Sequence, residues 1–170
     1  MSVDWQAGDL LDDQYTVVSL ISDVGAFSTV WLARRCVGTS SGELVALKAQ
    51  DAAYWDAAQE EIQVLRILDD ATPVQGSGPQ PTQAGARLQT HVVRLIDSFA
   101  VSIADAEEGQ QGGGGQVQEG GMVQVMVMDF LGGSLAKLLE TFPWRRGLPI
   151  NVVRRLAHDT LLGLAEMHRV

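Results

Sequence analysis

The chain has 170 residues, a formal net charge of −9 at pH 7 and a hydrophobic fraction of 46%. This length and composition are typical of one globular domain and exclude an intrinsically disordered chain. The acidic charge argues against direct binding of nucleic acid, because phosphate contacts need clustered Lys and Arg. It is compatible with a basic peptide partner, although an acidic surface also serves solubility alone.

The cysteine content and the hydropathy exclude further classes of protein. The single cysteine, Cys36, cannot form an internal disulfide, and no Cys/His cluster has metal-ligand spacing, so we expect no metal site. No apolar run approaches the length of about 18 residues that spans a membrane, and residues 1–13 are acidic and unlike a secretory signal. We therefore expect a protein without membrane contact, in the cytoplasm, the nucleus or both.

After an N-terminal tail, residues 1–13, the first half of the chain predicts a small sheet and one helix. Runs of β-branched and apolar residues predict three strands, at 15–21, 29–34 and 44–49. The first two strands are joined by a glycine-containing turn and form a hairpin. Apolar residues then recur every three or four positions from Ala53 to Leu68, which predicts an amphipathic helix.

The second half of the chain predicts two strands and then two helices, at 92–101, 122–130, 135–142 and 149–168. The second of these strands is strongly apolar, which indicates burial on both faces. Pro149 suits a helix start, where its missing N–H would be unsatisfied anyway. Two low-complexity stretches predict flexible insertions: 72–90, with three prolines, three glycines and several glutamines, and 104–121, which contains Gly112-Gly113-Gly114-Gly115.

A lysine and a glutamate in the first half suggest nucleotide chemistry. Lys48 follows Val45-Ala46-Leu47 in the third strand, and Glu61 lies on the helix after it. A strand lysine of this kind reaches nucleotide phosphates and is held by a glutamate of the next helix. Taken alone, a lysine at a strand end is usually solvated and a helix glutamate is usually a surface charge. Their order behind a glycine-containing turn makes chance the weaker explanation.

The turn compares with the phosphate-covering pattern G-x-G-x-x-G-x-V, but Gly25 is the only glycine of the pattern that is kept. By itself the turn is more typical of an ordinary hairpin. Asp23 takes the place of the first glycine, and its carboxylate is expected to weaken the binding of nucleotide phosphates without abolishing it. The candidate contacts in this segment are Ser22, Asp23, Val24, Gly25, Ala26, Phe27, Ser28, Thr29 and Val30.

The end of the buried strand is a candidate adenine site. Met128-Asp129-Phe130-Leu131-Gly132 loses regular structure after the strand, and an extended segment can offer backbone N–H and C=O groups to a purine edge. Met128 would close the pocket behind it; the alternative is that Met128 is a core methionine. The candidate contacts outside the turn are Ala46, Lys48, Met128, Asp129 and Leu131.

With these residues the chain resembles the N-terminal part of the kinase domain of SR-protein kinases, the Ser/Thr kinases of arginine/serine-rich splicing factors. The most telling match is Phe27-Ser28-Thr29-Val30-Trp31, because most kinases carry glycine where Ser28 stands. The other matching segments are Gly8-Asp9-Leu10, Val45-Ala46-Leu47-Lys48, Glu61-Ile62, 92–99, Leu131-Gly132, Gly147-Leu148-Pro149 and 163–168.

The resemblance implies an α+β fold: a kinase small lobe with a five-stranded antiparallel sheet and one helix, then the first two helices of the large lobe. Residues 14–132 would form the small lobe and hinge, and residues 133–170 the start of a truncated large lobe. The resemblance also implies ATP and Mg²⁺ as cofactors, with Lys48 and Glu61 as catalytic residues. It further implies protein serine as the phosphate acceptor, in Arg/Ser-rich substrates.

The 170 residues contain neither an H-R-D-x-x-x-x-N catalytic loop nor a D-F-G segment. These supply the residue that accepts the substrate proton and the metal ligands, so we expect this chain alone to transfer no phosphate. Asp23 and the missing segments favour an alternative, a non-catalytic pseudokinase-like binding module, whereas the intact Lys48 and Glu61 favour a kinase. A third interpretation is an α+β domain with no nucleotide site. The sequence specifies no oligomeric state.

Overall fold

The computed structural model describes residues 3–23, 27–38, 41–71, 91–102, 121–141 and 147–169. The predicted insertion at 72–90, and all of the one at 104–121 except Gly121, lie outside these residues. Within the described ranges, no helix has the length and apolar character needed to cross a membrane. The chain divides into two compact units, Met1–Leu65 with Arg94–Phe130, and Arg66–Val93 with Leu131–Val170.

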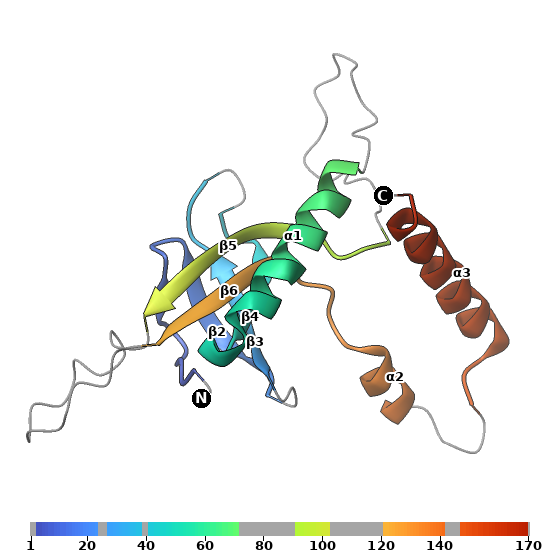
Figure 1. The fold of residues 1–170 in the computed structure, drawn as a ribbon. Helices are drawn as coiled ribbons and strands as arrows, with labels where there is room; N and C mark the ends of the chain where they lie inside the picture. Colours follow the sequence, from blue (N-terminus) through green and yellow to red (C-terminus); the bar gives the residue numbers. More distant parts are fainter. Residues whose placement is uncertain are drawn as a thin grey trace, which may run out of the picture. The chain divides into compact units, whose positions relative to one another are not determined.

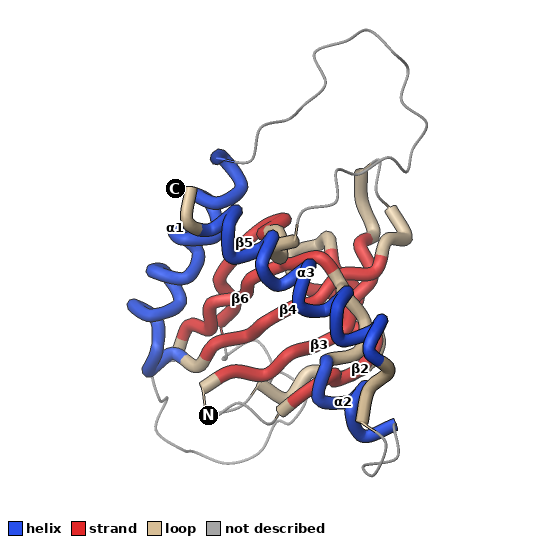
Figure 2. The backbone as a smooth tube through the Cα atoms, turned by 90° about the vertical axis from the view of Figure 1, so that its right-hand side faces the viewer, coloured by secondary structure: helices blue, strands red, loops and turns tan. Residues whose placement is uncertain are grey.

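The first unit is built on an antiparallel sheet of six strands in the order β1-β2-β3-β4-β6-β5. Figure 2 shows β2, β3, β4, β6 and β5 as neighbours in this sheet. The strands are β1 (Leu10–Leu11), β2 (Tyr15–Ser22), β3 (Ser28–Arg35), β4 (Leu44–Gln50), β5 (Leu95–Ser102) and β6 (Met122–Asp129). A short 3₁₀ turn, Ala52–Tyr54, leads into helix α1, Trp55–Ala71 (Figure 1).

The five predicted strands and the helix after the third are confirmed, with differences at their ends. β5 begins at Leu95 and not at Val92. The sixth strand, β1, was not predicted, because two residues are too few to show an alternating pattern. It pairs with β2 through Leu11 and Tyr15. The stretch 1–13, predicted to be a tail, thus carries a strand and contributes Trp5 and Leu11 to the core.

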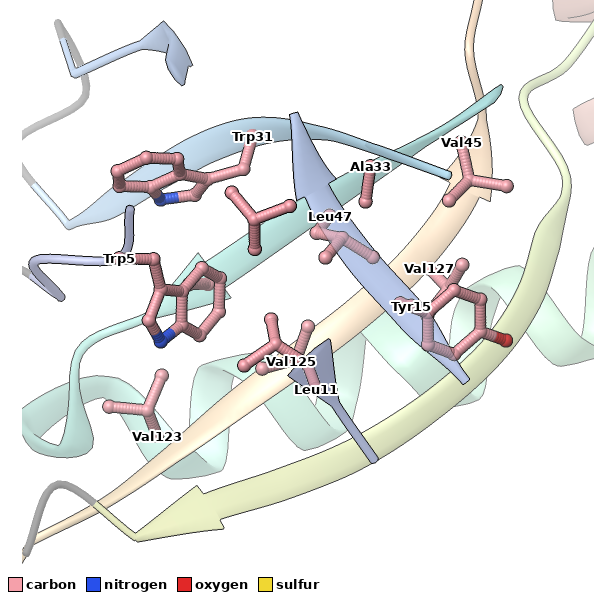
Figure 3. Packing of buried hydrophobic residues seen from close by; sticks show 12 residues of the cluster. Trp5, Leu11, Tyr15, Trp31, Ala33, Val45, Leu47, Val123, Val125 and Val127 are labelled. Atoms are coloured by element: carbon pink, nitrogen blue, oxygen red, sulfur yellow. The ribbon is translucent and has the colours of Figure 1, made fainter. Parts of the chain in front are cut away.

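The main core lies on one face of the sheet. Successive side chains of a strand point to opposite faces, so alternate residues of β4 and β6 share a face. The residues of these two strands that enter the core are Val45, Leu47, Ala49, Val123, Val125 and Val127. Figure 3 views this face, with Trp5 and Trp31 over the strands and α1 behind them. The intervening residues, among them Lys48 and Met126, therefore face α1.

Tyr15 connects β2, the second strand in the sheet order, to β5 at the far end of that order. Its hydroxyl donates to Asp97 Oδ2 on β5 over 3.1 Å, and its ring stacks on Phe99 with centroids 5.7 Å apart. β2 and β5 are not neighbours in the sheet, so the contact requires a strongly curved sheet (Figure 3). Burial, and then the negative charge of Asp97, raise the pKa of Tyr15 to about 12.

The second unit contains the two predicted helices, α2 (Leu135–Thr141) and α3 (Ile150–Met167), the latter with Pro149 at its N-cap. The segment that begins at His91 packs on α3. The backbone N–H of His91 donates to Glu166 Oε2, and His91 Nδ1 lies 3.1 Å from Glu166 Oε1. The hydrogen bond from His91 lowers the pKa of Glu166. The covered face of α3 therefore includes polar residues.

Candidate functional site

Lys48 and Glu61 are in direct contact in the first unit. Lys48 Nζ lies 2.7 Å from both Oε1 and Oε2 of Glu61. The side chains are 22% and 36% exposed, so the pair is half-buried rather than solvated. An ammonium has three N–H donors. Two of them are engaged by the Glu61 carboxylate, which leaves the third for a further acceptor.

The elements around the pair place the two side chains. Lys48 is held in the middle of β4, between Val30 of β3 and Met126 of β6. On α1, Ile62 is 2% exposed and packs against Leu95 and Met126, which seats the helix on this face of the sheet. Glu61 precedes Ile62 and lies at the edge of the seated face, whereas Glu60 is exposed. The sequence thus positions a carboxylate over the strand lysine by burying its neighbour.

Apolar side chains beside Lys48 form a half-buried patch. In an antiparallel pair, residues directly opposite each other project to the same face. Val30 is opposite Lys48, and Ala46 is opposite both Leu32 and Met128. All of these apolar residues therefore lie on the lysine's face, and each is partly exposed. We refer to Val30, Leu32, Ala46 and Met128 as the apolar patch.

The predicted turn residues do not all present their side chains to this face. Val24, Gly25 and Ala26 lie outside the described residues, and Asp23 is exposed. Thr29 projects to the other face, where its Oγ1 accepts a hydrogen bond from Trp31 Nε1 over 3.1 Å. Thr29 could therefore contact a ligand on the lysine's face only through its backbone.

Phe27, which follows the undescribed part of the turn, contacts the segment that leads into α1. The ring of Phe27 contacts Tyr54 of the 3₁₀ turn, with centroids 4.4 Å apart and planes tilted by 56°. The backbone oxygen of Phe27 also accepts from the N–H of Asp51 over 3.2 Å. Ser22 and Ser28, which flank the turn, are half-buried at the ends of β2 and β3. The turn is thus tied to the same segment that begins the helix carrying Glu61.

At the end of β6 the chain leaves the sheet next to the apolar patch. Asp129 is the last residue of the strand, and its carboxylate lies 3.3 Å from the Arg94 guanidinium. Its backbone N–H donates to the Arg94 oxygen over 3.3 Å. Leu131, which follows, is 75% exposed and belongs to the second unit. The Arg94 contact fixes the point at which the extended segment begins.

Sequence reasoning missed four residues around the site. Leu32 and Met126 share the face of Lys48, but only the strand register reveals it. Gln59 and Gln124 form a hydrogen bond of 2.7 Å between α1 and β6. The sequence did contain a signal for Gln124, because it is a polar residue inside a strand predicted to be buried on both faces.

The described residues hold no group of three or more His, Cys, Asp or Glu that could bind a metal ion. The pair and the apolar patch therefore offer a cation and an apolar surface, the two elements that suit a phosphate and a purine ring. They do not offer a set of ligands for Mg²⁺.

No protein-family model matches the chain. Three curated protein kinases do resemble it in sequence. It is 30% identical to the Serine/threonine-protein kinase SKY1 of Saccharomyces cerevisiae, over 85% of this chain and 16% of that protein. It is 27% identical to the Serine/threonine-protein kinase SRPK of Physarum polycephalum, over 96% of this chain and 31% of that protein. It is 27% identical to the Protein kinase dsk1 of Schizosaccharomyces pombe, over 85% of this chain and 22% of that protein.

Among solved structures, the crystal structure of a kinase domain covers 99% of this chain with a TM-score of 0.65 and 16% identity, while the chain covers 39% of that domain. This likeness shows that the chain has the fold of the corresponding part of a protein kinase domain. The curated relatives confirm the resemblance to SR-protein kinases. The chain spans less than a third of the length of each of these three relatives.

Proposed function

We propose that this chain is the ATP-binding part of a Ser/Thr protein kinase that resembles the SR-protein kinases. The observation that carries the proposal is the Lys48–Glu61 pair beside the apolar patch. Glu61 holds the ammonium on the face of β4 where Ala46 and Met128 are partly exposed. A purine on the patch would bring its phosphates toward Lys48.

Each residue has one task in this proposal. Lys48 donates to phosphate oxygens and compensates their charge, and Glu61 keeps the ammonium in position. The apolar patch excludes water from one face of the purine, and the backbone oxygen of Asp129 accepts a hydrogen bond from its edge. Mg²⁺ neutralises phosphate charge when ATP is bound to a kinase. We propose no residue of the described part as its ligand.

The test is nucleotide binding with the chain's two lysines compared. Lys48→Met should weaken the binding of MgATP to the 170-residue chain at least tenfold, because it removes the charge that meets the phosphates. Lys137→Met changes the other lysine, which is exposed on α2, and should leave the affinity unchanged. Equal affinities for the two variants, or no binding by the unaltered chain, would refute the proposal.

The substrate part of the proposal rests on the relatives. We propose that the whole kinase phosphorylates serine in Arg/Ser-rich proteins and works in the cytoplasm, the nucleus or both. The net charge of −9 is complementary to such basic peptides. A longer protein that contains this chain and the two missing motifs should phosphorylate an Arg/Ser peptide, and Lys48→Met should abolish the reaction. Equal activity on an Asp/Ser peptide would refute the proposed preference for Arg/Ser-rich substrates.

A non-catalytic binding module remains the second candidate, and Asp23 favours it. Its carboxylate stands where the phosphate-covering pattern has glycine, next to the site proposed for the nucleotide phosphates. A molecule of this kind would bind nucleotide or a partner without transferring phosphate. If the full-length natural protein binds ATP but transfers no phosphate, it is a binding module of this kind.

A further inference from the structure

A glutamine pair joins α1 to the sheet on the side of the helix away from Glu61. Gln59 Nε2 donates to Gln124 Oε1 on β6 over 2.7 Å, and Gln124 Nε2 donates to the backbone oxygen of Phe99 on β5 over 2.9 Å. Gln124 is 4% exposed. The chain of bonds therefore runs from the helix through a buried amide to the edge strand.

The direction of these hydrogen bonds is fixed by the backbone. The Phe99 carbonyl can only accept, so the amide nitrogen of Gln124 must face it. The amide oxygen of Gln124 then faces α1, and Gln59 must present its nitrogen. The Oε1 atom of Gln124 is thus a buried acceptor that faces α1, and it is satisfied only if the helix places a donor at the position of Gln59 Nε2.

Gln59 and Glu61 lie on the two flanks of the seated stripe of α1. Successive helix residues are rotated by about 100°, so residues two apart point about 200° apart around the axis. The stripe between them consists of Ala58, Ile62 and Leu65. Gln59 bonds β6 on one flank, and Glu61 bonds Lys48 of β4 on the other. A roll of the helix that lifts Glu61 from Lys48 therefore displaces Gln59 from Gln124.

Apolar packing alone does not define this roll. The contacts of Ile62 with Leu95 and Met126 are non-directional, so they tolerate a small rotation. A buried amide oxygen does not, because a rotation leaves it without a partner in a place that water does not reach freely. The glutamine pair supplies the directional contact that the apolar stripe lacks.

We propose that Gln59 and Gln124 are positioning residues, whose hydrogen bond fixes the roll of α1 and thereby keeps Glu61 on Lys48. This inference rests on the proposed function for its meaning, since the pair it maintains is the phosphate-binding pair. The hydrogen bond itself is tested without nucleotide.

The test measures how readily the Lys48 amine reacts with a water-soluble acylating reagent. Lys48 and Lys137 are the only lysines in the sequence, so the exposed Lys137 serves as an internal reference in peptide mass spectrometry. Gln59→Leu strands the Gln124 acceptor and should raise the ratio of Lys48 to Lys137 labelling about fivefold, the effect of one buried hydrogen bond on an equilibrium. Glu61→Gln, which removes the partner of Lys48, should raise it at least as much.

Two further variants separate positioning from general damage. Gln63→Leu makes the same change at an exposed position of α1 and should leave the ratio unchanged. The double variant Gln59→Leu with Gln124→Leu removes the hydrogen bond together with the buried acceptor, leaves only non-directional apolar packing, and should keep the ratio raised. All variants are labelled at a temperature where circular dichroism shows them folded.

The outcomes distinguish the two proposals. An unchanged ratio in Gln59→Leu, beside a raised ratio in Glu61→Gln, would overturn the positioning role. A ratio that returns to that of the unaltered chain in the double variant would overturn it as well, because the stranded acceptor, and not the lost directional contact, would then have released Glu61. If the unaltered chain binds no ATP while the labelling follows the expected order, the proposed function fails and the positioning role stands.

Discussion

The backbone carbonyl of His91 lies directly over Gly163 of α3, so closely that a β-carbon at Gly163 would be 2.7 Å from the His91 oxygen. Gly163 is the one buried residue of α3 within the described chain. Glu166, one turn further along, holds the backbone N–H and Nδ1 of the same histidine. Gly163 and Glu166 thus form the part of α3 on which the segment beginning at His91 packs.

Gly163→Ala is therefore expected to destabilise the second unit, although alanine is the better helix former by about 1 kcal/mol. The added methyl group meets a backbone atom that can move only if the segment lifts from the helix, and such overpacking costs about 1–3 kcal/mol. The measurement is hydrogen exchange at the His91 amide, which should lose protection. Ala165→Gly, at an exposed position of the same helix, gives the propensity effect alone. Increased protection in Gly163→Ala would contradict the prediction.

The stability of the first unit should fall at high pH through Tyr15. The folded pKa of Tyr15 is raised to about 12, above its ordinary value of about 10. A raised folded pKa means that the contribution is complete below the unfolded pKa and is lost as the pH rises toward the folded one. The loss should therefore occur between about pH 10 and pH 12.

Two variants measure this effect. In Tyr54→Phe, Tyr15 is the only remaining tyrosine of the chain's two, so the phenolate absorbance reports its titration directly. The midpoint should lie well above 10. Tyr15→Phe removes the titrating group, and its urea stability should depend less on pH in the same window. A Tyr15 midpoint near 10 would show that the contact with Asp97 does not hold in solution.

The β1–β2 turn offers a stabilising change. Asp12 and Asp13 both have positive φ, 49° and 52°, which the two central residues of a type I′ turn require and which glycine adopts without strain. Asp13→Gly should raise the free energy of unfolding by about 1 kcal/mol, while Asp12 keeps its contact with Gln14 at 2.9 Å. Asp56→Gly, in the first turn of α1, should lower it by a similar amount. Urea titrations compare the two, and a loss of stability in Asp13→Gly would refute the turn assignment.

Asp23→Gly should tighten ATP binding. At about 4 Å, a carboxylate and a phosphate charge repel by ~1 kcal/mol in water, and Asp23 is exposed, so the gain is at most about fivefold in Kd. Asp23→Asn removes the charge but keeps the size and should give most of the gain. The effect should shrink as salt is added, because salt screens exposed charges. Unchanged affinity in both variants would mean that Asp23 points away from the phosphates.

The strands and helices were predictable because their patterns are long: in the structure, the five strands that the sequence predicted have seven or eight residues each. Lys48 and Glu61 were predictable as a pair, since a strand and the helix after it fix their separation. The side on which Thr29 projects was not, because it depends on register with β4 and not on residue type. Gln124 could be noticed as a polar residue within an apolar run, but its pairing with Gln59 could not be predicted, because the two residues are 65 positions apart in sequence.

The strand order has a consequence for synthesis on the ribosome. β4 pairs with β6 and not with β5, so the strand made last is inserted between two made earlier. Until residue 129 has emerged, β4 presents an open edge, and the face of Lys48 lacks Met126 and Gln124. The sheet is therefore completed only when the last of its strands in sequence has been made, and until then the unpaired edge of β4 is open to pairing with other chains.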